Sequence, residues 1–233
     1  NINNNWIKIG DDINGEAAGD KLGTSVSLSA DGAIVAIGAP YYSIPNGEPD
    51  CGHVRIYRNI NNTWNQVGGD IYGIGGYDNS GASVSLSADG TIVAIGAPHN
   101  NGNGHVRIYR NINNTWTQIG DDINGEAAGD NSGASVSLSA DGSVVAIGAN
   151  YNDGNGSNSG HVRIFRNIEG KWEQIGNDID GEAANDNSGE SVSLSADGSI
   201  VAIGAAWNDG NGNNSGHVRL YKNINNSWIK IGD

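Results

Sequence analysis

An octapeptide, Ser-Val-Ser-Leu-Ser-Ala-Asp-Gly, occurs four times in this chain of 233 residues, beginning at Ser25, Ser83, Ser135 and Ser191. Each copy is followed by a Val-Ala-Ile-Gly-Ala segment, then by Gly-His-Val-Arg, and then by a tryptophan. The intervals between successive copies are 58, 52 and 56 residues. A period of about 50 residues is typical of propellers, solenoids and repeat arrays. The repeats therefore constrain the fold more than any other feature of the sequence.

Each repeat has room for four short strands. In the first repeat, Val26 and Leu28 alternate with serines, which predicts a strand over 24–30 with one apolar face. The segment 33–39 is small and apolar throughout, as expected of a strand buried on both sides. A third strand is predicted over 52–60 and a fourth around Trp64. We expect an all-β fold, a four-bladed β-propeller of four-stranded antiparallel blades, or else an excerpt of a longer propeller or repeat array.

Two kinds of turn join these strands. Asp31-Gly32 predicts a two-residue hairpin turn that requires positive φ angles, and Asn61-Asn62 turns the third strand into the fourth. On this basis residues 1–233 form a single domain. The repeat units are about 12–71, 72–121, 122–177 and 178–233.

The tryptophan strand has a fifth copy at the start of the chain. Residues 1–11 are identical to residues 223–233 except that Asn5 stands in place of Ser227. One interpretation is a piece of a longer array. The other is a spare strand, which closes a ring by pairing in the last blade, lies beside that strand as a fifth, or is donated to a neighbouring molecule.

The differences in repeat length lie in one loop. The segments 40–51, 98–103, 150–159 and 206–215 contain 12, 6, 10 and 10 residues, and these differences account for the whole spread of the repeat intervals. Insertions confined to one face of a stacked-repeat fold often mark the binding face. We therefore expect ligands to bind at the end of the molecule where these loops lie.

The repeated motifs resemble the FG-GAP repeats of integrin α-chain propellers and their bacterial relatives. The resemblance rests on the octapeptide, on the triplets Gly38-Ala39-Pro40 and Gly96-Ala97-Pro98, and on Gly-His-Val-Arg-Ile-Tyr. It implies that the loops after the second and fourth strands share the face that contacts ligands. The Phe-Gly opening of the family appears here only as Leu22-Gly23 or Ser-Gly, and its Asp-rich calcium loop is shortened to Ala-Asp-Gly.

Ring-bearing side chains recur at equivalent positions of the variable loops, and polar residues follow them. An aromatic platform with neighbouring amides and carboxylates is typical of sugar recognition, and four such sites would add avidity to weak contacts. The alternative is that the rings only shield the loop bases. The candidate ligand-binding residues are Tyr41, Tyr42, His99, Asn100, Tyr151, Asn152, Asp153, Trp207, Asn208 and Asp209.

An aspartate also recurs in the loop that precedes each octapeptide. Such loops can hold Ca²⁺ through carboxylates and backbone carbonyls, and they are equally ordinary turn chemistry. Apart from Ca²⁺ at this position, no cofactor is expected. The candidate metal ligands are Asp20, Asp78, Asp130 and Asp186.

The histidine and arginine of each Gly-His-Val-Arg segment are expected to be structural. An arginine at a packing position between strands needs a carboxylate or carbonyl partner, and the aspartates near each tryptophan strand are candidates. The residues concerned are His53, His105, His161 and His217, with Arg55, Arg107, Arg163 and Arg219.

The overall charge restricts the partners. Lys and Arg total 12 against 26 Asp and Glu, a formal net charge of −14, which argues against nucleic acid and anionic membranes. No apolar run approaches the ~18 residues of a membrane span, so no membrane insertion is expected. The single Cys51 cannot form a disulfide within the chain. Because the chain begins at Asn1 rather than Met, one interpretation is that it is processed or excerpted.

No nucleophile elbow, zinc-protease motif or phosphate-binding loop is present, and from this we predict that the chain is not an enzyme. The predicted function is an extracellular or cell- or virion-surface binding and adhesion module. Its predicted partner is a glycan or a surface protein. The alternative is a structural subunit that forms homo-oligomers through its duplicated terminal strand.

Overall fold

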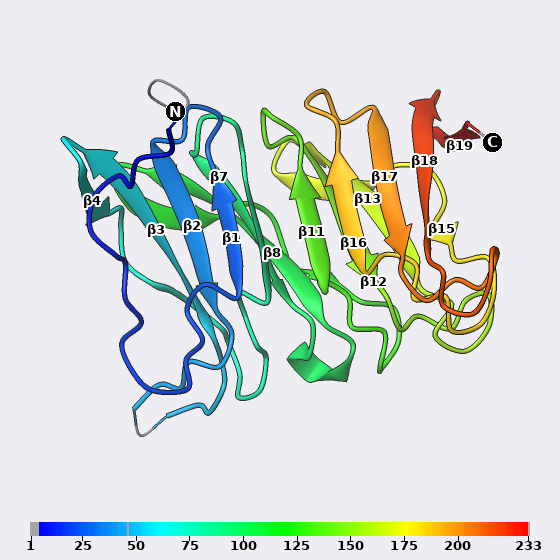
Figure 1. The fold of residues 1–233 in the computed structure, drawn as a ribbon, viewed down its shortest axis with the longest axis horizontal. Coiled ribbons are helices and arrows are strands. Elements are labelled where there is room, and N and C mark those ends of the chain that lie inside the picture. Colours follow the sequence, from blue (N-terminus) through cyan, green and yellow to red (C-terminus); the bar gives the residue numbers. More distant parts are fainter. Residues whose placement is uncertain (1–4, 46, 233) are drawn as a thin grey trace.

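The computed structural model describes residues 5–45 and 47–232, which form four antiparallel sheets arranged side by side (Figure 1). The first sheet contains β1 (Ser25–Leu28), β2 (Ile34–Ala39), β3 (His53–Ile60), β4 (Thr63–Gln66) and β5 (Ile71–Tyr72). The second contains β6 (Ser83–Leu86), β7 (Ile92–Ala97), β8 (His105–Ile112), β9 (Thr115–Gln118) and β10 (Ile123–Asn124).

The third and fourth sheets repeat this order. The third contains β11 (Ser135–Leu138), β12 (Val144–Ala149), β13 (His161–Ile168), β14 (Lys171–Gln174) and β15 (Ile179–Asp180). The fourth contains β16 (Ser191–Leu194), β17 (Ile200–Ala205), β18 (His217–Ile224) and β19 (Ser227–Ile231). The only helix in the described part of the chain is the short 3-10 helix Asn100–Gly102, and no helix there has the length and hydropathy to cross a bilayer. The predicted all-β architecture of four repeated sheets is confirmed.

The outer strand of each of the first three sheets is divided into two pieces. In the first sheet β4 pairs with one end of β3 and β5 with the other, with Ile60 opposite Thr63 and His53 opposite Tyr72. The backbone between the two pieces passes through Gly68 at φ +75°. The sequence analysis predicted one outer strand around each tryptophan and did not anticipate this break.

The turn between β1 and β2 differs from the prediction. Ser29 N donates to Ile34 O, so four residues form the loop, and only Gly32 among them has a positive φ, +69°. Asp31 accepts hydrogen bonds from Ser29 Oγ at 2.6 Å and Ala33 N at 2.9 Å. The aspartate therefore stabilises the turn by its hydrogen bonds and does not adopt a left-handed backbone.

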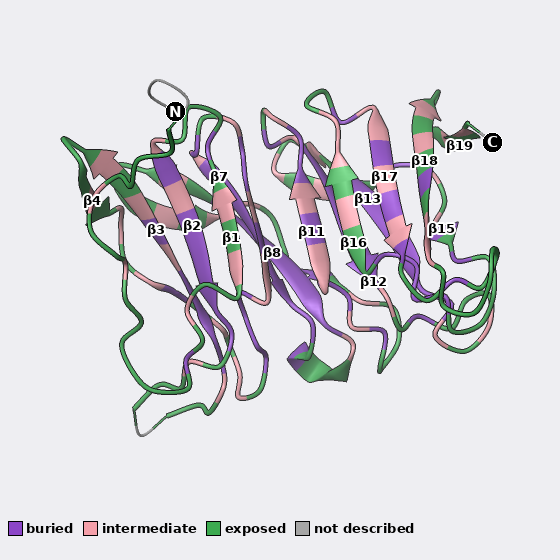
Figure 2. Cartoon of the chain, viewed as in Figure 1, coloured by how far each residue is buried: buried purple, intermediate pink, exposed green. Residues whose placement is uncertain are grey.

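The hydrophobic core lies between adjacent sheets. Each of three apolar clusters combines residues from two neighbouring sheets, as Val54 and Ile56 of β3 do with Val84 and Leu86 of β6. Burial is greatest in the second and third sheets, where every residue of β7 and β12 is buried (Figure 2). The first and fourth sheets lie at opposite ends of the row.

Four hydrogen bonds recur at each of the three junctions between sheets. At the first junction, Ser25 Oγ donates to Gly81 O, Ala30 N to Ala88 O, Leu86 N to Ser27 Oγ and Trp116 Nε1 to Val67 O. Equivalent bonds join the second sheet to the third and the third to the fourth. The repeated sequence therefore produces a repeated interface.

The N-terminal copy of the tryptophan strand lies beside the first sheet. Ile9 O accepts a hydrogen bond from Trp64 Nε1 at 3.0 Å, as Val67 O does from Trp116. The segment thus takes the place that an outer strand of a preceding sheet would occupy. This placement was not among those derived from the sequence, which considered the last sheet or another molecule; residues 1–4 of the copy lie outside the described part of the chain.

Candidate functional site

The variable loops and the loops that precede β6, β11 and β16 lie at the same end of the molecule, which we call the loop end. Three equivalent hydrogen bonds join them: Asn100 Nδ2 donates to Asp78 Oδ1 at 2.8 Å, Asn152 Nδ2 to Asp130 Oδ2 at 3.0 Å and Asn208 Nδ2 to Asp186 Oδ2 at 2.8 Å. In Figure 1 these loops lie at the bottom of the sheets.

Four ring-bearing side chains are exposed at the loop end. Tyr41, Tyr151 and Trp207 are 41%, 45% and 51% exposed, and His99 is also exposed. Two of the rings have polar neighbours. Lys21 Nζ lies 4.1 Å from the centroid of the Tyr41 ring, and His99 Nδ1 lies 2.6 Å from Asn79 Oδ1. Each ring follows a strand of the same direction in its sheet, so all four lie at one end.

The polar residues that follow the rings have other roles. The buried Asn100, Asn152 and Asn208 hold the two loops together, so their amides face the protein. Tyr42 packs on His53 with ring centroids 4.4 Å apart. The three asparagine amides are therefore not available to a ligand in this conformation, which corrects the expectation that they form its polar contacts, whereas Tyr42 is partly exposed and remains a candidate contact.

Asp153 and Asp209 are exposed at the same end. Asp153 Oδ1 accepts a hydrogen bond from Asn158 N at 2.8 Å, and Asp209 Oδ1 accepts one from Asn214 N at 2.7 Å. Both aspartates close their loops with one oxygen. Their other oxygens can accept hydrogen bonds from a ligand.

The four candidate metal ligands are buried and lie one in each repeat. Asp20 Oδ2 accepts the N–H of Ala17 at 2.9 Å, and Asp78 Oδ2 accepts those of Ile74 and Gly75 at 3.0 and 2.7 Å. Asp130 and Asp186 accept the equivalent N–H groups of Ala127 and Ala183, both at 3.0 Å. These are the bonds of an aspartate that shapes a turn, the second role derived from the sequence. A cation there would have to replace N–H donors.

A pocket of about 400 Å³ lies at the loop end of the first sheet. It is formed between the loop that precedes β1 and the loop that follows β2, and Tyr41 and Tyr42 line it together with Glu16, Asp20 and Asp50. Rings and carboxylates therefore meet here in one hollow, as sugar recognition requires.

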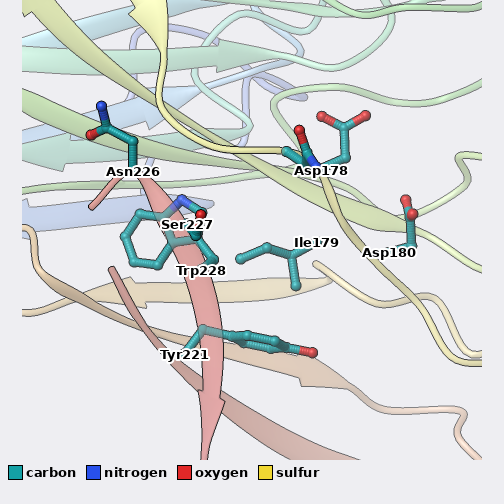
Figure 3. Close-up of a pocket in the computed structure, with 8 residues that line it drawn as sticks. Asp178, Ile179, Asp180, Tyr221, Asn226, Ser227 and Trp228 are labelled. Atoms are coloured by element: carbon teal, nitrogen blue, oxygen red, sulfur yellow. The ribbon is translucent and has the colours of Figure 1, made fainter. Parts of the chain in front are cut away.

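Four further hollows, which we call the rim grooves, recur where each tryptophan strand meets the preceding repeat. Their volumes are about 290, 370, 350 and 280 Å³. In the groove of the fourth sheet, Trp228 and Tyr221 lie opposite the segment Asp178-Ile179-Asp180 (Figure 3). No binding role was expected for the tryptophans from the sequence, and these grooves were not predicted. The recurring Asp-Ile pair before each octapeptide is the signal that could have indicated them.

The arginine of the repeated Gly-His-Val-Arg segment has different hydrogen-bond partners in different repeats. Arg55 makes a two-pronged contact with Asp70, at 2.9 and 2.7 Å. In the later repeats the arginine donates instead to a carbonyl of the preceding sheet, as Arg107 does to Tyr72 O at 2.7 Å. The carboxylate partner predicted from the sequence is therefore confirmed for Arg55, whereas Arg107 has the carbonyl partner.

Two groups of side chains combine metal-ligand types: Glu16, His53 and Asp70, and Glu126, His161 and Asp178. In the second group, His161 Nδ1 lies 3.9 Å from both carboxylates, and Arg163 lies 3.6 Å from Glu126. Burial lowers the pKa of His161, so the imidazole is neutral and able to coordinate. The nearby guanidinium competes with a cation for the carboxylates, which favours the structural role expected from the sequence.

Residues 124–165 and 179–221 match the FG-GAP repeat. These two matches fall in the third and fourth repeats of the chain. The predicted resemblance is therefore confirmed, and FG-GAP repeats are typical of extracellular or surface proteins. No curated protein sequence matches the chain.

Several solved structures have a similar fold. A protein named as a 6-phosphogluconolactonase from Bacteroides uniformis is 14% identical with a TM-score of 0.60, over 89% of this chain and 52% of its own. The periplasmic gluconolactonase of Pseudomonas aeruginosa is 13% identical with a TM-score of 0.59, over 89% and 56%. The hydrazine synthase of Kuenenia stuttgartiensis is 11% identical with a TM-score of 0.57, over 95% and 53%. This chain spans about half the length of these chains, and the similarity confirms the propeller fold.

The comparisons contradict the prediction that the chain is not an enzyme. Two of the similar structures are named as lactonases, so this arrangement of sheets occurs in proteins named as enzymes. The prediction rested on the absence of local catalytic motifs. That argument fails because a propeller can assemble a site from residues that lie in different repeats.

Proposed function

We propose that the FG-GAP repeats form a multivalent glycan-binding module at an extracellular or cell- or virion-surface location, and that glycans bind at the loop end. The observation that carries this proposal is the exposure of one ring at the equivalent position of each repeat, Tyr41, His99, Tyr151 and Trp207. A ring stacks on the C–H face of a sugar, and neighbouring carboxylates accept its hydroxyl protons. Four weak sites on one rigid body raise the affinity for a repeated glycan.

The hydrogen bonds beneath the rings support this proposal. The buried pairs Asn152–Asp130 and Asn208–Asp186 fix the loops that carry Tyr151 and Trp207. A ring held by a fixed loop loses little conformational freedom on binding, which favours affinity. The exposed oxygens of Asp153 and Asp209 lie two residues after the rings and can accept hydrogen bonds from sugar hydroxyls.

The test begins with a glycan array probed with the labelled chain, followed by calorimetry with the best glycan. The double variant Tyr151→Ala, Trp207→Ala should weaken binding at least about tenfold, because two of four stacking contacts are lost. The matched control is Ile112→Ala, since Ile112 is also exposed, at 51%, and lies at the other end of β8. Unchanged affinity in the double variant would contradict the proposal.

A second variant separates the loop end from the rim grooves. Asp178→Asn removes a carboxylate charge in the groove that Trp228 and Tyr221 line. If glycan binding is lost in this variant and kept in the double variant, the glycan binds in the rim grooves and the proposed location is wrong. If the chain binds no glycan on the array, the proposal that its ligand is a glycan is wrong.

A further inference from the structure

The first sheet has an open apolar face. Val26 and Leu28 of β1 are 64% and 60% exposed. The residues at the same positions of the second sheet, Val84 and Leu86, are 8% and 7% exposed because the first sheet covers them. We call this surface of the first sheet the head face. Its sequence is that of a buried surface, and its exposure follows from the absence of a preceding sheet among the described residues.

The fourth sheet has the complementary open face. Val218 and Leu220 of β18 are 64% and 41% exposed, whereas the equivalent Val106 and Ile108 of β8 are 0% and 1% exposed. At each junction within the chain, the two residues equivalent to Val218 and Leu220 pack against the two residues of the next sheet that are equivalent to Val26 and Leu28. We call this surface of the fourth sheet the tail face. Figure 2 shows the two faces at opposite ends of the row of sheets.

The polar groups of the two faces are complementary as well. Ser25, Ser83 and Ser135 each donate a hydrogen bond to a glycine carbonyl of the next sheet, whereas the equivalent Ser191 makes no such bond in the described part of the chain. The glycine at the accepting position of the first sheet is Gly23, and in the described part of the chain nothing lies within 4 Å of the place where its Cβ would be. At Gly81 that place is 2.7 Å from His53 O.

The contact between a glycine and the tryptophan of the next sheet is also missing at the tail, within the described part of the chain. A Cβ on Gly68 would lie 2.8 Å from Trp116 Cδ1, and one on Gly176 would lie 2.8 Å from Trp228 Cδ1. The equivalent residue after β19 is Gly232, and among the described residues no atom outside its chain neighbours lies within 4 Å of its Cβ position. The tail therefore has an unused place for a tryptophan of a following sheet.

We propose that the tail face of one molecule binds the head face of a second copy of this chain. The junction would repeat the three junctions already present: Val218 and Leu220 against Val26 and Leu28, Ser191 Oγ to Gly23 O, and Ile231 O accepting from Trp64 Nε1. The head and tail of one molecule lie at opposite ends of the row and do not cover each other, and their residues repeat those of the internal junctions, which favours a second copy as the occupant. This proposal does not depend on glycan binding.

The N-terminal segment controls access to the head face. Trp6–Gly10 and Trp228–Gly232 have the same sequence, Trp-Ile-Lys-Ile-Gly, and Ile9 O already accepts the Trp64 indole N–H. The incoming β19 of a second copy therefore displaces a segment identical to its own end. In the exchange, the hydrogen bond from Trp64 Nε1 to Ile9 O is replaced by an equivalent bond to Ile231 O of the second copy. The apolar faces become buried in addition, and this burial favours association.

Two equivalent substitutions test this exchange with opposite results. A Cβ on Gly10 would lie 2.9 Å from Trp64 Cδ1, so Gly10→Ala loosens the N-terminal segment and should strengthen association. Gly232→Ala should weaken association, since its Cβ would meet Trp64 of the second copy. Both glycines have positive φ, +69° and +82°, so the backbone cost of alanine is similar. Equal effects of the two substitutions would overturn the role of the N-terminal segment.

Sedimentation velocity from about 1 to about 300 µM measures the association itself. The wild-type chain should associate, and Val26→Asp with Leu28→Asp should weaken association at least about tenfold because charges enter an apolar junction. Val218→Asp with Leu220→Asp should do the same. Both pairs are exposed in the monomer, so it should remain folded. The control is Ile112→Asp, because Ile112 is exposed although its sheet is covered on both faces.

Mixing the two double variants gives the decisive result. The head variant keeps an intact tail and the tail variant an intact head, so each alone should be monomeric and the mixture should form a heterodimer. A mixture that stays monomeric while the wild type associates would show that the pairing is not head to tail. A wild-type chain that is monomeric over the whole concentration range would also overturn the proposal.

Discussion

Glycines at equivalent positions of the repeats have the same backbone conformation but different surroundings. Substituting them therefore separates the effect of backbone conformation on stability from the effect of packing. Gly81 and Gly23 have φ angles of +90° and +94°. A Cβ on Gly81 would lie 2.7 Å from His53 O and 3.0 Å from Val54 Cγ2, whereas a Cβ on Gly23 would have no neighbour within 4 Å among residues 5–45 and 47–232. The close approach at Gly81 is required by the junction between the first two sheets.

Gly81→Ala should therefore destabilise the protein by about 1–3 kcal/mol more than Gly23→Ala, because both variants have the same backbone strain and only the first is overpacked. Urea unfolding of dilute samples, followed by circular dichroism, measures the difference. Equal losses would show that the close contact relaxes without cost.

The buried histidines make the fold sensitive to acid. Burial lowers the pKa of His53, His105 and His161, and the neighbouring arginine lowers it further. Below a pH of about 6.5 the histidines of the unfolded chain become protonated, whereas the buried imidazoles of the folded chain stay neutral to a lower pH. The unfolded state then binds more protons, so the free energy of unfolding falls as the pH falls.

We expect a lower free energy of unfolding at a pH of about 5.5 than at a pH of about 7, with urea titrations as the measurement. His105 is the best residue to substitute, because Ile74 stands where the three other repeats have a glutamate near the histidine. His105→Asn should be less stable at neutral pH and should lose less stability on acidification. A variant with the wild-type pH dependence would exclude His105 as a source of the effect.

At the scale of the element, a serine in the first strand of each of the first three sheets joins that sheet to the next by a hydrogen bond. Ser83 Oγ donates to Gly133 O at 2.7 Å, and Ser191 occupies the same position in the last sheet without such a bond in the described part of the chain. Ser83→Ala should cost about 1 kcal/mol, the usual net value of a hydrogen bond.

Ser191→Ala serves as the matched control and should leave the unfolding midpoint of the dilute chain unchanged. A loss at Ser191 as large as that at Ser83 would mean that the serine stabilises its own strand and not the junction.

At the scale of the whole molecule, position in the row decides the stability of a sheet. The strands β2, β7 and β17 have the same sequence, Ile-Val-Ala-Ile-Gly-Ala, so the amides after the first isoleucine have the same intrinsic exchange rates. All six residues of β7 are buried, whereas burial alternates along β17. A sheet covered on one face opens at lower cost than one covered on both.

Hydrogen exchange measured by mass spectrometry on dilute protein should therefore be slowest in β7 and faster in β17. The difference should shrink at high concentration if the tail face becomes covered by a second copy. Equal protection of the two strands in dilute solution would contradict a stability that depends on neighbouring sheets.

Much of the fold follows from the sequence because its repeats are nearly identical and its strands alternate with a period of two. The positions of the strands, their order and the common end of the variable loops were predictable from the octapeptide, the apolar segments and the loop lengths. The candidate site was predictable only in part. Tyr151 and Trp207 are exposed as expected, whereas Asn152 and Asn208 turn inward because a buried aspartate in the preceding loop accepts their amides.

What only the tertiary structure decided is how identical sequences differ in their surroundings. The segment His-Val-Arg-Ile-Tyr-Arg occurs in β3 and β8, yet Arg55 pairs with Asp70 and Arg107 donates to Tyr72 O of the preceding sheet. The sequence determines that each sheet has two apolar faces and an arginine that needs a partner. Whether a face is covered, and which partner the arginine finds, depends on the sheet that stands next to it, because packing is an interaction between elements and not a property of either one.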